Sequence, residues 1–304
     1  MASVEYVDRW TGERVQESVM GDKALRFAYE TLLGRTLWPV LFGSKLVSAL
    51  LGAYYDSPRS KKAIKALAAI PGCRADEAEM PLAEYASFNS FFTRKLKAGA
   101  RPLGEGIVSP ADGRLRLYLN ADLDSPFPLK GATKTLRTLF ASRTSHFAPR
   151  TSHFSLPSSL DLVVLRLAPV DYHRFHFPCD CDVLGEPLVI PGKYHSVNPI
   201  ALLKYPNVYA DNERQIVAAR AAFGDFWMID VGAFGVGTII ATYSGASQQK
   251  GAERGYFKFG GSTVILAFPA GAVKFDADLV ANSAKGLETR VFALESIASS
   301  VAAP

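Results

Sequence analysis

The stretch Tyr256-Phe257-Lys258-Phe259-Gly260-Gly261-Ser262-Thr263-Val264-Ile265 lies close to the C-terminus of the chain. It places a Gly-Gly-Ser-Thr segment directly before an apolar run, residues 264–268. Glycine reaches backbone angles that other residues avoid. The pattern therefore predicts a tight turn that leads into a buried strand, with Ser262 in the turn.

Working outward from this stretch, the chain divides into a helical part and a strand-rich part. From residue 107 onward, short runs of Val, Ile, Leu and Phe alternate with Gly, Pro and Asp turns, which indicates strands. The expected strands are residues 160–167, 182–190, 226–231, 238–243 and 264–268. Residues 22–70 and 82–96 have helical patterns. The sequence therefore predicts an α+β fold, with an N-terminal helical region (1–100) followed by a β-rich catalytic core (101–304).

The predicted helical segment 22–70 carries an apolar stripe. The stripe approximates the i, i+3, i+4, i+7 spacing of one helix face, and its members are Leu37, Val40, Leu41, Val47, Leu50, Leu51 and Tyr54. The cations Arg59, Lys61, Lys62 and Lys65 follow closely. An interfacial helix needs such a stripe beside cations that meet anionic lipid. An ordinary helix packed on a protein core has the same pattern, so both interpretations stay open here.

Composition excludes several classes of protein. The chain is 48% hydrophobic and 21% charged, which is typical of a globular protein and not of a disordered one. Its net charge of +5 suits an anionic surface without requiring one, and we expect no nucleic-acid partner. The charged start of the chain predicts no signal peptide. The longest apolar stretch, residues 37–55, is interrupted by Pro39, Gly43, Lys45 and Gly52, so we expect no transmembrane helix.

The chain has three cysteines, Cys73, Cys179 and Cys181. This low, odd number argues against a disulfide framework and favours a reducing, cytoplasmic compartment. Cys179 and Cys181 have metal-ligand spacing, but no second Cys/His pair nearby completes a tetrahedral set. We therefore expect no metal site.

Three side chains could together form an activated-serine site. Asp112 stands in Ser109-Pro110-Ala111-Asp112-Gly113, His176 stands in Tyr172-His173-Arg174-Phe175-His176-Phe177-Pro178, and Ser262 follows two glycines. A serine hydroxyl is a poor nucleophile until a base takes its proton, and a carboxylate can fix the tautomer of a histidine base. Taken singly, each residue also fits an ordinary role, as a turn aspartate, a core histidine or a turn serine.

These segments, in this order, resemble the phosphatidylserine decarboxylase proenzyme family. The resemblance runs over nearly the whole chain. Its further segments are Phe88-Asn89-Ser90-Phe91-Phe92-Thr93-Arg94-Lys95-Leu96, Arg101-Pro102, Tyr194-His195-Ser196-Val197-Asn198-Pro199 and Val231-Gly232-Ala233-Phe234-Gly235-Val236-Gly237-Thr238-Ile239. The Gly-Gly-Ser-Thr motif resembles the shorter, bacterial-type branch.

The resemblance implies that the chain is made as a proenzyme and cuts itself between Gly261 and Ser262. The Ser262 hydroxyl would attack the Gly261 carbonyl, with His176 as the base and Asp112 holding His176. Elimination from the resulting ester, followed by hydrolysis, would turn Ser262 into a pyruvoyl group, the covalent cofactor. The products would be a β chain of residues 1–261 and an α chain of residues 262–304.

The resemblance also implies decarboxylation of phosphatidylserine to phosphatidylethanolamine and CO2. The substrate amine would form a Schiff base with the pyruvoyl ketone, which would accept the electrons left by CO2. His173 would be the acid in this reaction or a contact to the substrate carboxylate. The family segment that contains His195 and Asn198 would bind substrate, although Asn-Pro is also an ordinary turn signal. Arg174 could hold the carboxylate or phosphate of the substrate, or it could be a structural ion pair. In a strand, residues 173 and 176 would face opposite sides, whereas in a turn they could converge.

The implied partners are phosphatidylserine, an anionic membrane surface, the two chains for each other, and a second copy in a possible homodimer. The expected location is the periphery of a membrane. One rival is a pyruvoyl-dependent decarboxylase of a soluble amino acid. Others are a Ser-His-Asp hydrolase, although no Gly-x-Ser-x-Gly elbow surrounds Ser262, and a non-enzymatic membrane-binding protein.

Two further patterns carry no chemistry. Arg-Thr-Ser-His-Phe occurs at residues 143–147 and again at 150–154, and we interpret residues 143–159 as a surface loop. Gly232, Gly235 and Gly237 do not follow the dinucleotide-binding order, so close packing of strands is the better interpretation.

Overall fold

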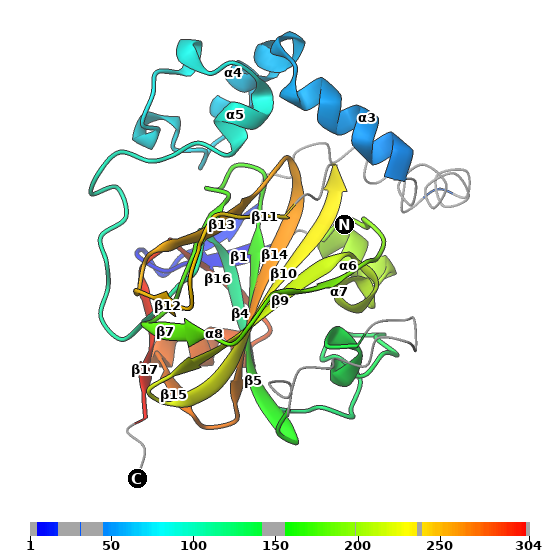
Figure 1. The fold of residues 1–304 in the computed structure, drawn as a ribbon, viewed down its shortest axis with the longest axis vertical. Coiled ribbons are helices and arrows are strands. Elements are labelled where there is room, and N and C mark those ends of the chain that lie inside the picture. The colour runs from blue at the N-terminus through cyan, green and yellow to red at the C-terminus, as the bar shows by residue number, and fades with distance from the viewer. Residues whose placement is uncertain are drawn as a thin grey trace.

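A computed structural model describes residues 5–17, 31, 45–141, 156–197, 199–235 and 239–301 of the chain. These residues confirm the α+β class, with a β-rich core and a group of helices in the N-terminal part (Figure 1). The helices are α3 (Lys45–Asp56), α4 (Lys62–Ala68), α5 (Phe88–Phe92), α6 (Pro199–Lys204), α7 (Val208–Asp211) and α8 (Ala277–Ala284). Short 3-10 turns are at Pro58–Lys61, Ala75–Glu77, Leu82–Glu84 and Leu136–Leu139.

The strands lie mostly in the second part of the chain. In order, they are β1 (Glu5–Asp8), β2 (Arg14–Gln16), β3 (Ile107–Val108), β4 (Gly113–Asp122), β5 (Ser159–Leu167), β6 (Arg174–His176), β7 (Cys181–Val183), β8 (Leu188–Ile190), β9 (Arg214–Ala221), β10 (Gly224–Gly235), β11 (Ile239–Ala241), β12 (Ser247–Gln248), β13 (Glu253–Phe257), β14 (Gly260–Pro269), β15 (Val273–Phe275), β16 (Glu288–Val291) and β17 (Ser296–Ser300). The expected strands at 160–167, 226–231 and 264–268 are confirmed as parts of β5, β10 and β14.

Four expectations about local structure were wrong. The Gly-Gly-Ser-Thr segment is not a turn, because Gly260 already begins β14. The single strand expected at 182–190 is divided into β7 and β8, with Gly185 at φ +92° between them. Of the strand expected at 238–243, the described residues contain a shorter one, β11 (Ile239–Ala241). The helix expected at 82–96 is a 3-10 turn followed by α5, because the extended Ser87 caps a new helix by accepting the backbone N–H of Ser90.

The largest sheet in the described part of the chain has eleven strands, in the order β12-β7-β9-β10-β14-β5-β4-β16-β1-β2, with β8 also paired to β9. Two three-stranded sheets, β11-β13-β6 and β15-β17-β3, accompany it. Both neighbours of β14 run antiparallel to it. The apolar run near the C-terminus is therefore at the centre of the sheet, not at an edge.

The central strands are buried on both faces. Along β14, Val264, Leu266 and Phe268 contribute to one apolar cluster, and Ile265 and Ala267 contribute to the other. This follows from the period of two in a strand, which sends successive side chains to opposite faces. Because both faces are covered, the strand has a nearly continuous apolar sequence.

The N-terminal helices form a third apolar cluster at one end of the sheet. It contains Ile64, Leu67, Phe88, Phe91 and Phe92, together with residues of the loop that follows β5. Figure 1 shows α3, α4 and α5 beyond the end of β10. Part of the predicted stripe of residues 22–70 is thus described in α3, whereas Leu37, Val40 and Leu41 lie outside the described residues. The domain boundary near residue 100 stays a prediction.

Two strands that were not expected from the sequence precede these helices. β1 pairs in parallel with β16, and β2 pairs with β1. The first described residues of the chain therefore join the main sheet beside a strand from its last twenty residues. Most of the expected loop at 143–159, including both copies of the repeat, lies outside the described residues.

None of the helices that the structure describes is long and apolar enough to cross a membrane.

Candidate functional site

Ser262 is a strand residue, held between two neighbours. It lies opposite Gly232 of β10 and Leu167 of β5. The pairing of β14 with β5 begins at this residue, because the ladder of pairs runs from Ser262 to Pro269. Gly260 and Gly261 therefore have no partner in β5. The Gly261–Ser262 peptide bond lies where the regular ladder ends.

The other neighbour of this bond is also irregular. Gly232 pairs with Ser262 and Gly235 pairs with Gly260, with a register shift between the two pairs. β10 thus has two residues where β14 has only Gly261, which is a β-bulge. A bulge disrupts the local ladder, so the backbone of Gly261 is held by irregular pairing on one side and by none on the other.

The Ser262 hydroxyl is completely buried, and its Oγ has no hydrogen-bond partner among the described residues. A buried hydroxyl without a partner loses its bonds to water and gains nothing in return. Such groups are rare, and they concentrate where chemistry requires them. By the alternation of β14, Ser262 is on the same face as Val264.

Asp112 lies at the same end of the sheet. Arg114 pairs with Arg166 across β4 and β5, which places Gly113 opposite Leu167, the partner of Ser262. Asp112 precedes Gly113, so it is two strands from Ser262, roughly 10 Å at the usual strand spacing. The fold therefore brings together two predicted residues that are far apart in the sequence.

The carboxylate of Asp112 is fully occupied. Arg101 donates from Nε to Oδ1 at 2.9 Å and from Nη2 to Oδ2 at 2.6 Å, and the backbone N–H of Ala293 donates to Oδ1 at 2.8 Å. Asp112 is 3% exposed. Burial alone would lower the pKa of Arg101, but its bonds to Asp112 and Glu77 outweigh this effect and raise it. Asp112 is thus clamped by groups from two distant segments.

His176 ends β6 beside the Asp112 turn, where its backbone N–H donates to the carbonyl of Pro110 at 2.7 Å. Its Nδ1 is 2.9 Å from the carbonyl oxygen of Gly251, and its Nε2 is 3.2 Å from the hydroxyl of Tyr172. A carbonyl can only accept, so Nδ1 carries the proton and Nε2 carries the lone pair. Burial lowers the pKa of His176, which favours a neutral imidazole at neutral pH.

No hydrogen bond joins His176 to Asp112 or to Ser262 in the described part of the chain. The three predicted residues share one end of the fold, but their side chains do not form a continuous hydrogen-bonded chain. No pattern in the sequence indicated that Gly251 and Tyr172 would hold the imidazole.

His173 lies just before β6, next to the strand that leads to Ser262, since its carbonyl accepts the backbone N–H of Phe257 at 3.0 Å. Its Nδ1 is 3.0 Å from the carbonyl of Asp171, and its ring centroid is 3.8 Å from that of Phe92. Nε2 is buried and has no partner among the described residues. Burial lowers the pKa of His173 to about 3, so the ring is neutral at pH 7.

Arg174 is part of an ion pair. Its Nη1 is 2.8 Å from both carboxylate oxygens of Glu253, and its Nε donates to the carbonyl of Thr93 at 2.9 Å. The side chain of Arg174 therefore links β6 to β13 and to the end of α5. This is the structural role that an arginine at this position could have instead of substrate binding.

In the described part of the chain, the hydrogen bonds that link His195 to the site are made by its backbone. The side-chain amide of Asn212 accepts from the N–H of His195 and donates to the carbonyls of His195 and Gly232, at 3.0, 2.7 and 2.8 Å. Gly232 is the partner of Ser262, so Asn212 ties this loop to the strand beside Ser262. Burial lowers the pKa of His195 to about 4. Asn198 lies outside the described residues.

The helical layer covers this end of β14. The side-chain carbonyl of Asn89 accepts the backbone N–H of Phe259 at 2.9 Å, and the amide of Asn89 donates to Asp56 at 3.0 Å. The ring of Phe259 contacts those of Tyr55, Phe88 and Phe92. The segment just before Gly260 is therefore fixed by α3 and α5.

Arg94 holds the loop that carries His173. It is 2% exposed, and its Nη2 donates to the carbonyls of Cys73, Val170 and Asp171. Arg94, Asn89 and Arg101 all belong to segments that carried the family resemblance. Their residue types and their spacing in the sequence did not indicate which groups they would bind.

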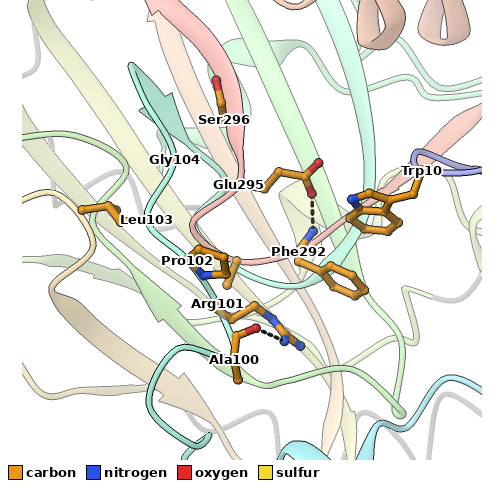
Figure 2. Close-up of a pocket in the computed structure, with 10 residues that line it drawn as sticks. Trp10, Ala100, Arg101, Pro102, Leu103, Gly104, Phe292, Glu295 and Ser296 are labelled. Carbon is orange, nitrogen blue, oxygen red and sulfur yellow. Dashed lines mark hydrogen bonds between the residues drawn. The ribbon is translucent and has the colours of Figure 1, made fainter.

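The three cysteines are free and buried. Among the described residues, no group of three or more His, Cys, Asp or Glu side chains is arranged to hold a metal ion. A cavity of about 280 Å³ lies beside the clamp on Asp112, and Figure 2 shows Trp10, Arg101, Phe292 and Glu295 in its lining.

Comparison with known proteins gives a consistent result. A family model described as phosphatidylserine decarboxylase matches residues 88–298. The chain is 39% identical to a phosphatidylserine decarboxylase proenzyme of Ruminiclostridium cellulolyticum, over 97% of each chain. It is 37% identical to the one of Fusobacterium nucleatum over 95% of each chain. It is 36% identical to the one of Chlamydia felis over 99% of each chain.

Proposed function

The chain belongs to the phosphatidylserine decarboxylase family, and on that premise we propose that it decarboxylates phosphatidylserine after cutting its own backbone between Gly261 and Ser262. The products are phosphatidylethanolamine and CO2. The matched region, residues 88–298, contains Asp112, His173, His176 and Ser262. The matches to the relatives cover nearly the full length of each chain, and these relatives are called proenzymes, which supports maturation by cleavage.

One observation carries the self-cleavage proposal. The Ser262 Oγ is buried without a partner, next to a peptide bond that lies at the end of one ladder and opposite a bulge in the other. An acyl shift needs a free nucleophile and a backbone that can leave its regular geometry. Glycine at position 261 adds no Cβ that would obstruct the attack.

In the first step, Ser262 Oγ bonds to the carbonyl carbon of Gly261, the C–N bond breaks, and the nitrogen takes a proton. The product is an ester. Removal of the Cα proton of residue 262 then expels the Gly261 carboxylate and leaves a dehydroalanine, which water converts to the pyruvoyl group and ammonia. His176 is suited to take the hydroxyl proton, because Gly251 fixes the lone pair on Nε2. The Tyr172 hydroxyl must leave that nitrogen or pass the proton on.

The orphaned Ser262 Oγ also fits the expected cofactor, because the group forms from this side chain. When present, the pyruvoyl group supplies a ketone that takes the substrate amine and accepts the electrons released with CO2. His173 is suited to move a proton. Its Nδ1 is held by Asp171, its Nε2 is unoccupied, and Phe92 shields the ring.

Both chains would remain in one fold after cleavage. The α chain begins within β14, which keeps its pairs with β10 and β5, and it also contributes β16 and β17 to ladders with β4 and β3. A cut at one end of a central strand removes none of these pairs. The homodimer stays a prediction.

A lipid substrate is favoured over a soluble amino acid by the exposed side of α3. Leu50 is 64% exposed and Tyr54 is 39% exposed, and the cations Lys61, Lys62 and Lys65 are exposed nearby. Apolar side chains in water beside cations are suited to an anionic membrane surface. α3, which carries Leu50 and Tyr54, is linked to the site end of β14, because its Asp56 binds Asn89 and Asn89 binds the backbone of Phe259.

Sedimentation with vesicles of anionic phospholipid tests this preference. We expect Leu50→Asp to weaken vesicle binding about tenfold, because one leucine no longer enters the lipid. Leu119→Asp is the matched control, because Leu119 is 45% exposed on β4, beyond the part of that strand nearest Asp112. A wild type that does not sediment with the vesicles would favour the soluble substrate, and equal sedimentation of all three proteins would show that Leu50 does not contribute to membrane binding.

The intact mass of freshly purified protein under denaturing conditions tests the cleavage itself. We expect two chains, 1–261 and 262–304, the smaller one without a free amino terminus and with the mass of a ketone in place of an amine. A single uncut chain that stays intact for days contradicts the proposal. Ester hydrolysis by that uncut chain would favour the Ser-His-Asp hydrolase instead.

A further inference from the structure

We propose that residues 5–16, the N-terminal hairpin formed by β1 and β2, are a clasp on the turn Phe292–Glu295 and thereby position Asp112 for self-cleavage. The inference deepens the proposed function and rests on it. Residues 5–16 lie outside the matched region 88–298, so the family match says nothing about them, whereas the turn and Asp112 lie inside it. Three contacts carry the argument.

The turn Phe292–Glu295 is strained and directly bonded to Asp112. Leu294 has φ +68°, a conformation that costs free energy for a residue with a side chain. The next residue back, Ala293, donates its backbone N–H to Asp112 Oδ1 at 2.8 Å. The turn also bonds to Ser109, through Leu294 N–H and Glu295 O at 2.9 and 2.7 Å. Any shift of this turn therefore moves a donor on the carboxylate.

Arg9 holds one end of the turn. Its guanidinium donates to Asp276 at 2.7 Å, to Asp278 at 2.8 Å, to Glu295 Oε1 at 3.2 Å and to the carbonyl of Ser296 at 2.6 Å. The other oxygen of Glu295 accepts the backbone N–H of Phe292 at 3.0 Å and so closes the turn. One arginine side chain thus fixes the carboxylate that shapes the turn.

Trp10 holds the other end. Its ring stacks on that of Phe292, with centroids 4.2 Å apart, as Figure 2 shows. The ring of Phe292 also contacts the guanidinium of Arg101, which is 4.6 Å from the ring centroid and which binds the carboxylate of Asp112. The cavity of about 280 Å³ lies between these groups, so removal of Trp10 would leave Phe292 free to move into it.

The clasp joins the two future chains. β1 pairs with β16, and the acceptors of the Arg9 guanidinium among the described residues all lie beyond residue 262. The hairpin belongs to the β chain and its partners belong to the α chain. The beginning of one product thus holds the part of the other that reaches Asp112.

Time courses of cleavage in newly synthesised chains test the proposal. We expect Trp10→Ala and Arg9→Ala to slow cleavage about tenfold or more, because a small misplacement of a catalytic group is costly in rate. Trp10→Phe keeps the stacking and should restore the rate to within about twofold, because ring stacking is largely retained. Thermal unfolding of each variant, measured with Ser262→Ala also present, reports stability separately.

Val183→Ala is the matched control. Val183 is 8% exposed in β7, near the opposite edge of the main sheet from β1, and its truncation lowers stability without contact to the turn. The proposal is supported if Trp10→Ala cleaves slowly while Val183→Ala, at a similar loss of stability, cleaves at the wild-type rate. It is overturned if both cleave at the wild-type rate, or if both slow in proportion to lost stability. An uncut wild type would instead contradict the proposed function.

Discussion

Asp112 and Ser262 lie at the same end of the sheet, yet their surroundings are opposite. The carboxylate of Asp112 receives three hydrogen bonds, two of them from one guanidinium. The hydroxyl of Ser262 is just as deeply buried and receives none from the residues that the structure describes. The protein therefore surrounds the supporting group with fixed donors and leaves the reacting group unbound.

This difference indicates how the site is prepared before any reaction. Fixed donors around Asp112 need no rearrangement during catalysis, which is the advantage of a preorganised site. The unbound hydroxyl of Ser262, beside an irregular backbone, has no favourable bond to lose when it attacks. Three substitutions test this difference between the two groups and the residues around them.

The largest effect is expected at the unbound group. Ser262→Ala removes the nucleophile, so we expect no cleavage at Gly261–Ser262 and no decarboxylation. The fold should be retained, because an orphaned hydroxyl contributes little to stability. Mass spectrometry and thermal unfolding measure the two properties. Ser247→Ala, in the partly exposed β12, serves as the control and should be cut normally. Cleavage of Ser262→Ala at the same bond would remove this serine from the mechanism.

The next effect is expected at the clamped group. Arg101→Ala leaves the buried carboxylate of Asp112 without its cation, and breaking such a pair costs about 3–5 kcal/mol. Glu77, which is only partly buried, keeps its ion pair with Arg74. Cleavage should slow about a hundredfold, because Asp112 loses its orientation. Arg101→Lys keeps the charge but not the two-pronged geometry, so it should recover only part of both losses. Chemical denaturation and cleavage time courses measure them. Full activity in Arg101→Ala would show that the clamp is dispensable.

The smallest effect concerns the neutral histidine beside the site. Burial lowers the folded pKa of His173 to about 3, so the unfolded chain binds the proton first as the pH falls. This residue should therefore lower the free energy of unfolding by about 1.4 kcal/mol for each pH unit as the pH falls from about 6 to about 3. With Ser262→Ala also present, His173→Gln should flatten the profile over that window. His195→Gln should flatten it only down to about pH 4, where the folded pKa of His195 lies. Unchanged profiles would mean that His173 is protonated in the fold.

Much of the strand content could be predicted, because buried strands have continuous apolar runs. Residues 160–167, 226–231 and 264–268 were predicted on this basis and are strands. The start of β14 was missed, because Gly260 and Gly261 have turn-like composition and only tertiary pairing with β10 makes them a strand. The long helix expected at 82–96 was also wrong. Ser87 has an extended backbone and caps a separate, shorter helix, α5.

The identities of the candidate site residues came from family segments, and the fold places Asp112, His173, His176 and Ser262 at one end of the sheet. Their bonding could not be predicted. Arg101, Gly251, Tyr172 and Asn212 act through contacts with residues distant in sequence, and no local pattern indicates which partner such a group will meet. Arg174 illustrates the reverse case, because the charge that suggested a substrate contact is paired with Glu253.

The pairing of β1 with β16 also bears on the timing of maturation. Among the described residues, β1 can pair only with the neighbouring β2 until β16 has been synthesised, and Asp112 lacks one of its three donors until Ala293 has emerged from the ribosome. Sheets built from such distant pairs form late and slowly. A nascent chain that ends before β16 therefore contains Ser262 but an incomplete site. We therefore expect the irreversible cut to wait until β16 and the turn that follows it have been synthesised.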